Sequence, residues 1–147
     1  MRTVLLLALA ASGVVLGGCG HEGIALAQPA EDGALCKPDV AQRDVFIDVT
    51  YDKGGVPTVT PETCMVYAQG RITWRGPAKV LTQFQIDFHS TDGAVAAAFK
   101  AAGGKGSREM ADRQKFTLIA WDKVGPYTYD VSTAKGGTDP TIIIRPN

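Results

Sequence analysis

The chain has 147 residues, of which 15 are Lys or Arg and 15 are Asp or Glu, so its formal net charge is zero. A balanced charge argues against a nucleic-acid-binding protein, which needs a basic face to neutralise phosphates, and leaves no polybasic segment for anionic lipid. Hydrophobic residues make up 45% of the chain, enough for the core of one domain.

The N-terminal residues predict an export signal. Arg2 gives a positive start, and residues 4–16 form an apolar run that is too short to span a bilayer. The four residues that end at Cys19, Leu-Gly-Gly-Cys, resemble the bacterial lipobox, in which the cysteine is lipidated. A competing cleavage site follows Ala27, where Ala-Leu-Ala fits ordinary signal peptidase. We favour lipidation because Cys19 directly follows the apolar run; in the alternative, Cys19 is removed with the signal.

Lipidation at Cys19 would attach the protein to a membrane without a membrane-spanning segment. Residues 1–18 would then be the signal peptide, and residues 19–35, rich in Gly, Ala, Glu and Asp, a flexible tether. Gly20 after the cysteine fits an outer-membrane destination by the enterobacterial sorting rule. We therefore expect an exported, lipid-anchored protein of the periplasm or outer membrane, with the leaflet left open.

Cys36 and Cys64 are the two cysteines that remain. Paired cysteines in an exported chain usually oxidise, so we predict a disulfide between them. Closing this loop would stabilise the fold by roughly 3 kcal/mol in the chain-entropy model. The alternative is a soft thiolate metal site that includes Met65.

Alternating apolar residues predict β-strands from residue 44 onward. The first expected strand covers residues 44–51, and residues 56–60 follow as an edge piece because Pro57 cannot donate to a ladder. A longer unit covers residues 62–75, is broken at Gly70, and carries Trp74 toward the core.

The second half of the chain begins with the alternating strand at residues 84–88. Asp92 can cap a helix that runs to residue 102 and ends at Gly103. A polar loop at residues 103–112 should follow the helix. Further strands are expected at residues 114–121, 127–131 and 141–145, with a loop at residues 132–139.

Short alternating strands with one helix predict a Greek-key β-sandwich for residues 36–147. Three motifs in order, Gly-x-Ile-Thr-Trp at 70–74, Phe-x-Ile-x-Phe at 84–88 and Gly-x-Tyr-x-Tyr at 125–129, precede the aliphatic end of the chain. Together they resemble the cupredoxins, the plastocyanin-like copper proteins. The resemblance covers about residues 44–146 and implies an all-β sandwich of cupredoxin type with one short helix.

The copper ligands of that family are missing from this sequence. Phe84 stands at the position of the family's first copper-binding His, and Val131 stands at the position of its copper-binding Cys. The second His and the axial Met should lie within residues 132–135 and 136–140, which contain neither. A blue-copper centre needs two imidazoles and a thiolate. We therefore expect no metal site and no cofactor.

Other candidate chemistry has simpler explanations. We interpret His89 as a solvated surface residue, and its neighbour Ser90 as no part of a catalytic triad. A copper site from Cys64, Met65 and His89 would require a free Cys64 thiolate and would therefore exclude the disulfide. Three Asp residues at outward strand positions should keep the sheet soluble, although two could meet as a calcium or acid/base pair: Asp48, Asp87 and Asp130. A basic stretch around residues 100–115 favours a solvated face over a docking patch.

The sequence thus favours a non-enzymatic binding or structural protein of the cell envelope, with no catalytic residues and an unknown envelope protein or small ligand as partner. Its contact surfaces would be the loop after Val131 and residues 91–113, because a rigid sandwich presents function on its loops. The alternative is a copper-binding or electron-transfer protein with an atypical site.

Overall fold

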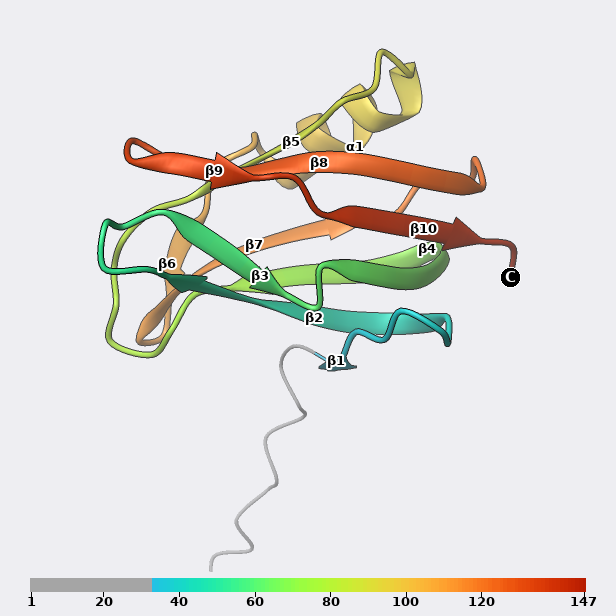
Figure 1. Ribbon diagram of the computed structural model, residues 1–147. Helices are drawn as coiled ribbons and strands as arrows, with labels where there is room; N and C mark the ends of the chain where they lie inside the picture. Colours follow the sequence, from blue (N-terminus) through green and yellow to red (C-terminus); the bar gives the residue numbers. More distant parts are fainter. Residues whose placement is uncertain (1–32) are drawn as a thin grey trace, which may run out of the picture.

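The computed structural model describes residues 33–147, which form ten strands and one helix (Figure 1). The expected signal peptide, Cys19, both cleavage sites and most of the tether lie outside the described residues. The strands are β1 (Ala34–Leu35), β2 (Gln42–Tyr51), β3 (Pro57–Thr60), β4 (Thr63–Arg75), β5 (Gln85–Phe88), β6 (Arg108–Met110), β7 (Arg113–Ile119), β8 (Gly125–Thr133), β9 (Gly136–Thr138) and β10 (Thr141–Arg145). The helix is α1 (Gly93–Ala102).

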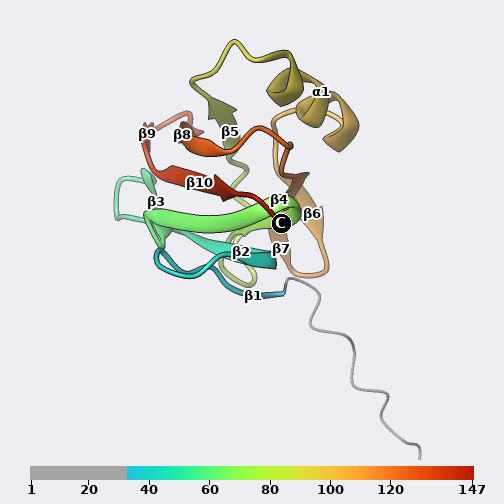
Figure 2. The ribbon, with the colours of Figure 1, turned by 90° about the vertical axis from the view of Figure 1, so that its right-hand side faces the viewer.

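The strands form a two-layer β-sandwich in which β4 belongs to both layers. The first half of β4 pairs in parallel with β10, which pairs antiparallel with β8. The second half of β4 pairs in parallel with β2 and antiparallel with β7. β5 and β9 pair with the second half of β8. Figure 2 shows β5, β8, β10, β4 and β2 stacked in this order, with α1 at the β5 end of the stack. The helix also contacts β7. The all-β sandwich with one short helix is confirmed.

The alternation seen in the sequence fixes which side chains enter the core. Val45, Ile47 and Val49 of β2 are buried, whereas Asp44 and Thr50 on the other face are exposed. The core is built mainly from aliphatic and aromatic residues, and its largest fully buried side chains are Trp74, Tyr129, Phe84, Ile47, Ile72, Ile86, Leu118, Ile142 and Ile144. Burial of this apolar surface is the main force that holds the two layers together.

The break at Gly70 lets β4 change layers. Gln69 has a φ of 60°, and a Cβ on Gly70 would lie 2.6 Å from the carbonyl oxygen of Arg43. The Gln69 N–H donates to the Ala120 carbonyl (3.0 Å), and the Ala120 N–H donates to that of Gly70 (2.8 Å). The backbone groups at the bend are therefore satisfied by the end of β7 while the strand turns. Glycine is required here because another backbone approaches closely.

The helix begins and ends as the sequence predicts. The Asp92 carboxylate accepts a hydrogen bond from the Ala94 N–H (2.9 Å), and Gly103 ends the helix with a φ of 79°. Val95 and Phe99 are buried, four residues apart on one face. The Phe99 ring lies 6.0 Å from that of Phe116, so the helix packs on β7.

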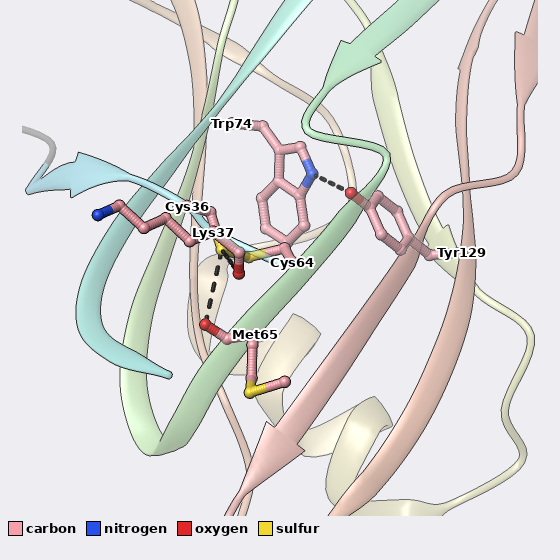
Figure 3. Close-up of a disulfide and its surroundings, with 6 residues drawn as sticks. All are labelled: Cys36, Lys37, Cys64, Met65, Trp74 and Tyr129. Carbon is pink, nitrogen blue, oxygen red and sulfur yellow. Dashed lines mark hydrogen bonds between the residues drawn. A yellow bond between two sulfur atoms is a disulfide. The ribbon is translucent and has the colours of Figure 1, made fainter. Parts of the chain in front are cut away.

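The predicted disulfide joins Cys36 to Cys64 (Figure 3). Both cysteines are buried, and the bond links the segment before β2 to the first half of β4. Ala34 and Leu35, which the sequence assigned to the tether, already pair with β2 as strand β1. No helix within residues 33–147 has the length and apolar character needed to cross a membrane.

Two expected loops are wrong, because each contains a strand. Arg108–Met110, placed in the polar loop 103–112, forms β6 and pairs antiparallel with β7. Residues 132–139, expected to be a loop, continue β8 to Thr133 and return as β9. Polar side chains hide the alternation in both hairpins. Gly136, at a φ of 140°, supplies the backbone conformation for the second turn.

Candidate functional site

The start of β5 and the β8–β9 hairpin meet at one end of the sandwich, where the resemblance would place copper ligands. Phe84 is 1% exposed and Val131 is 0% exposed, so both apolar side chains lie in the core. Ile86, two residues after Phe84, is the cross-strand partner of Val131. A shallow depression of about 520 Å³ opens beside them, lined by Gln83, Phe84, Gln85, Gly106, Ser107, Ser132, Thr133 and Ala134. No imidazole, thiol, thioether or carboxylate lies in this lining.

A closed hydrogen-bond network underlies the depression. The Phe84 N–H donates to the Ser107 hydroxyl (2.9 Å), which donates to the Gln114 side-chain oxygen (3.0 Å). The Ser107 N–H donates in turn to the Phe84 carbonyl (2.8 Å). Ser107 and Gln114 are both buried. These polar groups are therefore committed to the structure and hold the β6–β7 hairpin against β5.

A second group of side chains meets on the outer face of the β5–β8–β9 layer. His89 follows β5, Asp130 lies in β8, and Asp139 follows β9; a ring nitrogen and one carboxylate oxygen from each Asp lie within 4.8 Å of one another. His89 Nε2 is 2.7 Å from Asp130 Oδ1. The backbone N–H of His89 donates to the Thr128 carbonyl (3.0 Å), which holds the backbone of His89 against β8.

Strand register explains why these side chains converge. Val131 pairs with Thr138, so the antiparallel ladder places the next residues, Asp130 and Asp139, side by side. A hydrogen bond with Asp139, assisted by the His89 imidazole, holds the pKa of Asp130 below its ordinary value. The hydrogen bond with Asp130, and then partial desolvation and the negative charge of the Asp130 carboxylate, raise the pKa of Asp139 above its ordinary value. The pair therefore favours one shared proton or an added positive charge.

The three strand carboxylates considered in the sequence are not brought together as one set. Asp48 pairs with Arg75 (2.6 Å), whose guanidinium lies 3.3 Å from the centre of the Phe46 ring. Asp87 is the cross-strand neighbour of Asp130 but pairs with Lys105 (2.6 Å). These are half-exposed ion pairs of the kind that contributes little to stability.

The basic stretch at residues 100–115 does not form one cationic face. Lys105 pairs with Asp87, and Arg108 donates to the Gly103 carbonyl (2.8 Å). Lys115 is buried, 7% exposed. The disulfide, for its part, leaves no thiolate for the alternative copper site from Cys64, Met65 and His89.

Sequence reasoning considered His89 and Asp130 separately and did not consider Asp139. The sequence carried no signal that joins them. The Gly136-Gly137 pair is typical of a hairpin turn, but a turn at these two residues would have placed Asp139 opposite Ala134. The structure turns instead between the paired residues Thr133 and Gly136.

Comparisons with known proteins add information on shape alone. No family model matches the chain, and no curated protein matches it. Among solved structures, the chain is similar to oxidised plastocyanin from Dryopteris crassirhizoma (20% identity, 69% of this chain and 100% of that chain, TM-score 0.47). It is also similar to auracyanin A, a "blue" copper protein from Chloroflexus aurantiacus (14% identity, 69% and 98%, TM-score 0.39). A third is reduced auracyanin from Roseiflexus castenholzii (13% identity, 73% and 100%, TM-score 0.40).

These solved structures are cupredoxins, the family that the sequence motifs resemble. With identities of 20% or less and TM-scores below 0.5, they say nothing about metal or activity in this chain. The β-sandwich itself follows from the strand pairing described above.

Proposed function

We propose that the protein is a non-enzymatic binding or structural protein of the cell envelope, built on a cupredoxin-like domain that lacks a type-1 copper site. The observation that carries this proposal is the burial of Phe84 and Val131 where the resemblance expects a His and a Cys. A type-1 centre needs two imidazoles and a thiolate in one plane. Apolar side chains packed into the core at these positions supply none of these donors.

The imidazole of His89 cannot substitute for the missing ligands. It lies five residues along the chain from Phe84, mostly through β5, and a strand rises by about 3.3 Å per residue, so the separation is roughly 16 Å. His89 is also the only imidazole within residues 33–147. Cys36 and Cys64 are joined to each other, so neither supplies a thiolate.

A binding role is favoured by the depression at the same end of the sandwich. Its lining residues include hydroxyl and amide side chains beside the buried Phe84, and none of them carries a formal charge. Such a lining suits an uncharged polar ligand or a segment of polypeptide. The β8–β9 hairpin and the segment after α1 frame it, and both belong to the contact surfaces expected from the sequence.

The absence of enzymatic activity is supported by the partners of the nucleophile candidates within residues 33–147. Ser90 accepts a hydrogen bond from the Asp92 N–H (3.2 Å), while His89 faces Asp130. The adjacent Ser and His therefore do not form a nucleophile–base pair. Ser107 is buried and bonded to Gln114.

The test is direct. The mature protein is incubated with Cu²⁺ and desalted, and bound metal and visible absorption are measured. We expect no intense thiolate-to-copper band. Such a band would overturn the proposal and establish the second candidate function, a copper-binding or electron-transfer protein with an atypical site.

A further inference from the structure

We propose that His89, Asp130 and Asp139 form a binding site for one divalent cation of borderline softness, with Zn²⁺ as the best fit. This inference goes beyond the proposed function, because the site lies on the outer face of the β5–β8–β9 layer and shares no residue with the depression at Phe84.

The donor atoms are already close to a coordination geometry. They lie within 4.8 Å of one another, and His89 Nε2 is 2.7 Å from Asp130 Oδ1. Ligands at about 2.0–2.2 Å from a tetrahedral zinc ion are separated by roughly 3.3 Å. Small rotations of these half-exposed side chains would therefore bring one nitrogen and two oxygens onto a common ion.

The donors come from three segments that the fold holds rigidly. Asp130 lies within β8, where it pairs with Asp87 of β5, and the next residue, Val131, pairs with Thr138 of β9. His89 is tied to β8 through its backbone bond to Thr128, and the Tyr129 N–H donates to the Pro140 carbonyl (3.0 Å), directly after Asp139. The site is thus preorganised by the backbone, which reduces the entropy lost on binding.

The local charge also favours a cation. Two carboxylates meet there with a single imidazole, and Asp87, the cross-strand neighbour of Asp130, is paired with Lys105. Asp139 in addition lines a polar depression of about 300 Å³, together with Glu62, Thr63, Thr138, Pro140 and Thr141. This depression leaves room for water to complete the coordination shell.

The mixture of donors selects the kind of cation. Imidazole suits Zn²⁺ and Cu²⁺, whereas Ca²⁺ takes six to eight oxygen ligands and this cluster offers one nitrogen and two carboxylates. Three protein ligands with an open fourth position is a known zinc arrangement. Cu²⁺ should compete with Zn²⁺ at such a site, but without the visible band of a thiolate centre.

The experiment is a calorimetric titration of chelator-treated mature protein with Zn²⁺, followed by nuclear magnetic resonance of the His89 ring. We expect one saturable equivalent and metal-induced shifts at Nε2. Even outer-shell partners contribute about 10-fold to metal affinity, so His89→Gln, Asp130→Asn and Asp139→Asn should each weaken binding by at least that factor.

Two variants serve as controls. Asp87→Asn removes the neighbouring carboxylate on the same face, and His21→Gln removes the only other histidine; both should bind Zn²⁺ as the original protein does. Asp139 is exposed, so Asp139→Asn tests the site even if another variant fails to fold. The proposal is overturned if no saturable equivalent is seen, or if Asp139→Asn binds as well as Asp87→Asn. Neither result affects the proposed lack of a type-1 site, which the copper absorption tests separately.

Discussion

The indole N–H of Trp74 donates a 3.0 Å hydrogen bond to the hydroxyl of Tyr129 in the middle of the core. Trp74 belongs to β4 and Tyr129 to β8, so this bond joins the two layers of the sandwich (Figure 3). Both side chains are fully buried, and their rings lie 5.4 Å apart in an edge arrangement. Burial raises the pKa of the Tyr129 hydroxyl above its ordinary value, which keeps the group protonated.

Replacing Tyr129 by Phe should destabilise the fold by about 1–3 kcal/mol, because the buried Trp74 N–H loses its only described acceptor. Urea unfolding followed by tryptophan fluorescence measures the change. The matched control is Tyr127→Phe, whose hydroxyl donates to the Lys123 carbonyl at an exposed position (2.9 Å). Equal losses in the two variants would contradict the structural role of the buried bond.

Removing the disulfide with Cys36→Ala and Cys64→Ala together should cost roughly 3–4 kcal/mol, because the two residues are 28 positions apart and the unfolded chain regains the entropy of that loop. Denaturant unfolding of the double variant gives the value. In the original protein, thiol titration under native conditions should find both cysteines unreactive until a reductant is added. Free thiols in the exported protein would disprove the bond.

The cap of α1 predicts a pH-dependent contribution to stability. The hydrogen bond from the Ala94 N–H, and then the contact with Lys123, hold the pKa of Asp92 below its ordinary value. Because the pKa of Asp92 is lower in the folded than in the unfolded protein, its carboxylate stabilises the fold fully above the unfolded-state pKa of about 3.9. This stabilisation is lost as the pH falls through the folded-state pKa.

The comparison for this cap is Asp92→Asn, which keeps an oxygen acceptor but removes the charge. Thermal unfolding midpoints of the two proteins should differ most near neutral pH and converge as the solution is acidified below pH ~4. A difference that stayed constant down to strongly acidic pH would assign the effect to packing instead of charge.

Gly70→Ala should destabilise the protein by about 1–3 kcal/mol, because the new Cβ would lie 2.6 Å from one backbone carbonyl oxygen and 2.8 Å from another. Gly93→Ala is the matched control: nothing lies within 4 Å of its Cβ position, and the residue opens the helix. The control should be neutral or stabilising by about 0.4–1 kcal/mol. Chemical unfolding curves of both variants decide the question.

The expected lipid anchor can be tested by intact mass spectrometry of the protein isolated from the cell envelope. The mature chain should begin at Cys19 and carry the mass of the attached acyl groups. A mature chain that begins at Gln28 with no added mass would make the protein a free periplasmic one. Cys19→Ala should then leave its distribution between membrane and soluble fractions unchanged.

Features that depend on neighbouring residues could be predicted from the sequence. The alternation of Val45, Ile47 and Val49 gave the buried face of β2, because the two faces of a strand are set by a period of two. Asp92 and Gly103 marked the ends of α1 through capping, which is also local. The disulfide followed from the number of cysteines and the expected compartment.

Features that depend on pairing between distant segments could not be predicted. β6 and β9 are three residues each and contain a single apolar side chain between them, that of Met110, so neither shows the alternation that identifies a strand. The meeting of His89, Asp130 and Asp139 depends on the register of β9 on β8, which the pattern of single residues does not contain. The change of layer within β4 was visible only as a break at Gly70.

The bond between Cys36 and Cys64 also decides how the domain responds to mechanical load. A pull on the chain ahead of Cys36 passes through the sulfurs into β4, so β2 and β3, which lie inside the closed loop, carry no tension. The load leaves the domain at the far end of β10, which runs parallel to the first half of β4. The two strands are therefore loaded in shear, and their backbone hydrogen bonds must rupture together instead of unzipping one at a time.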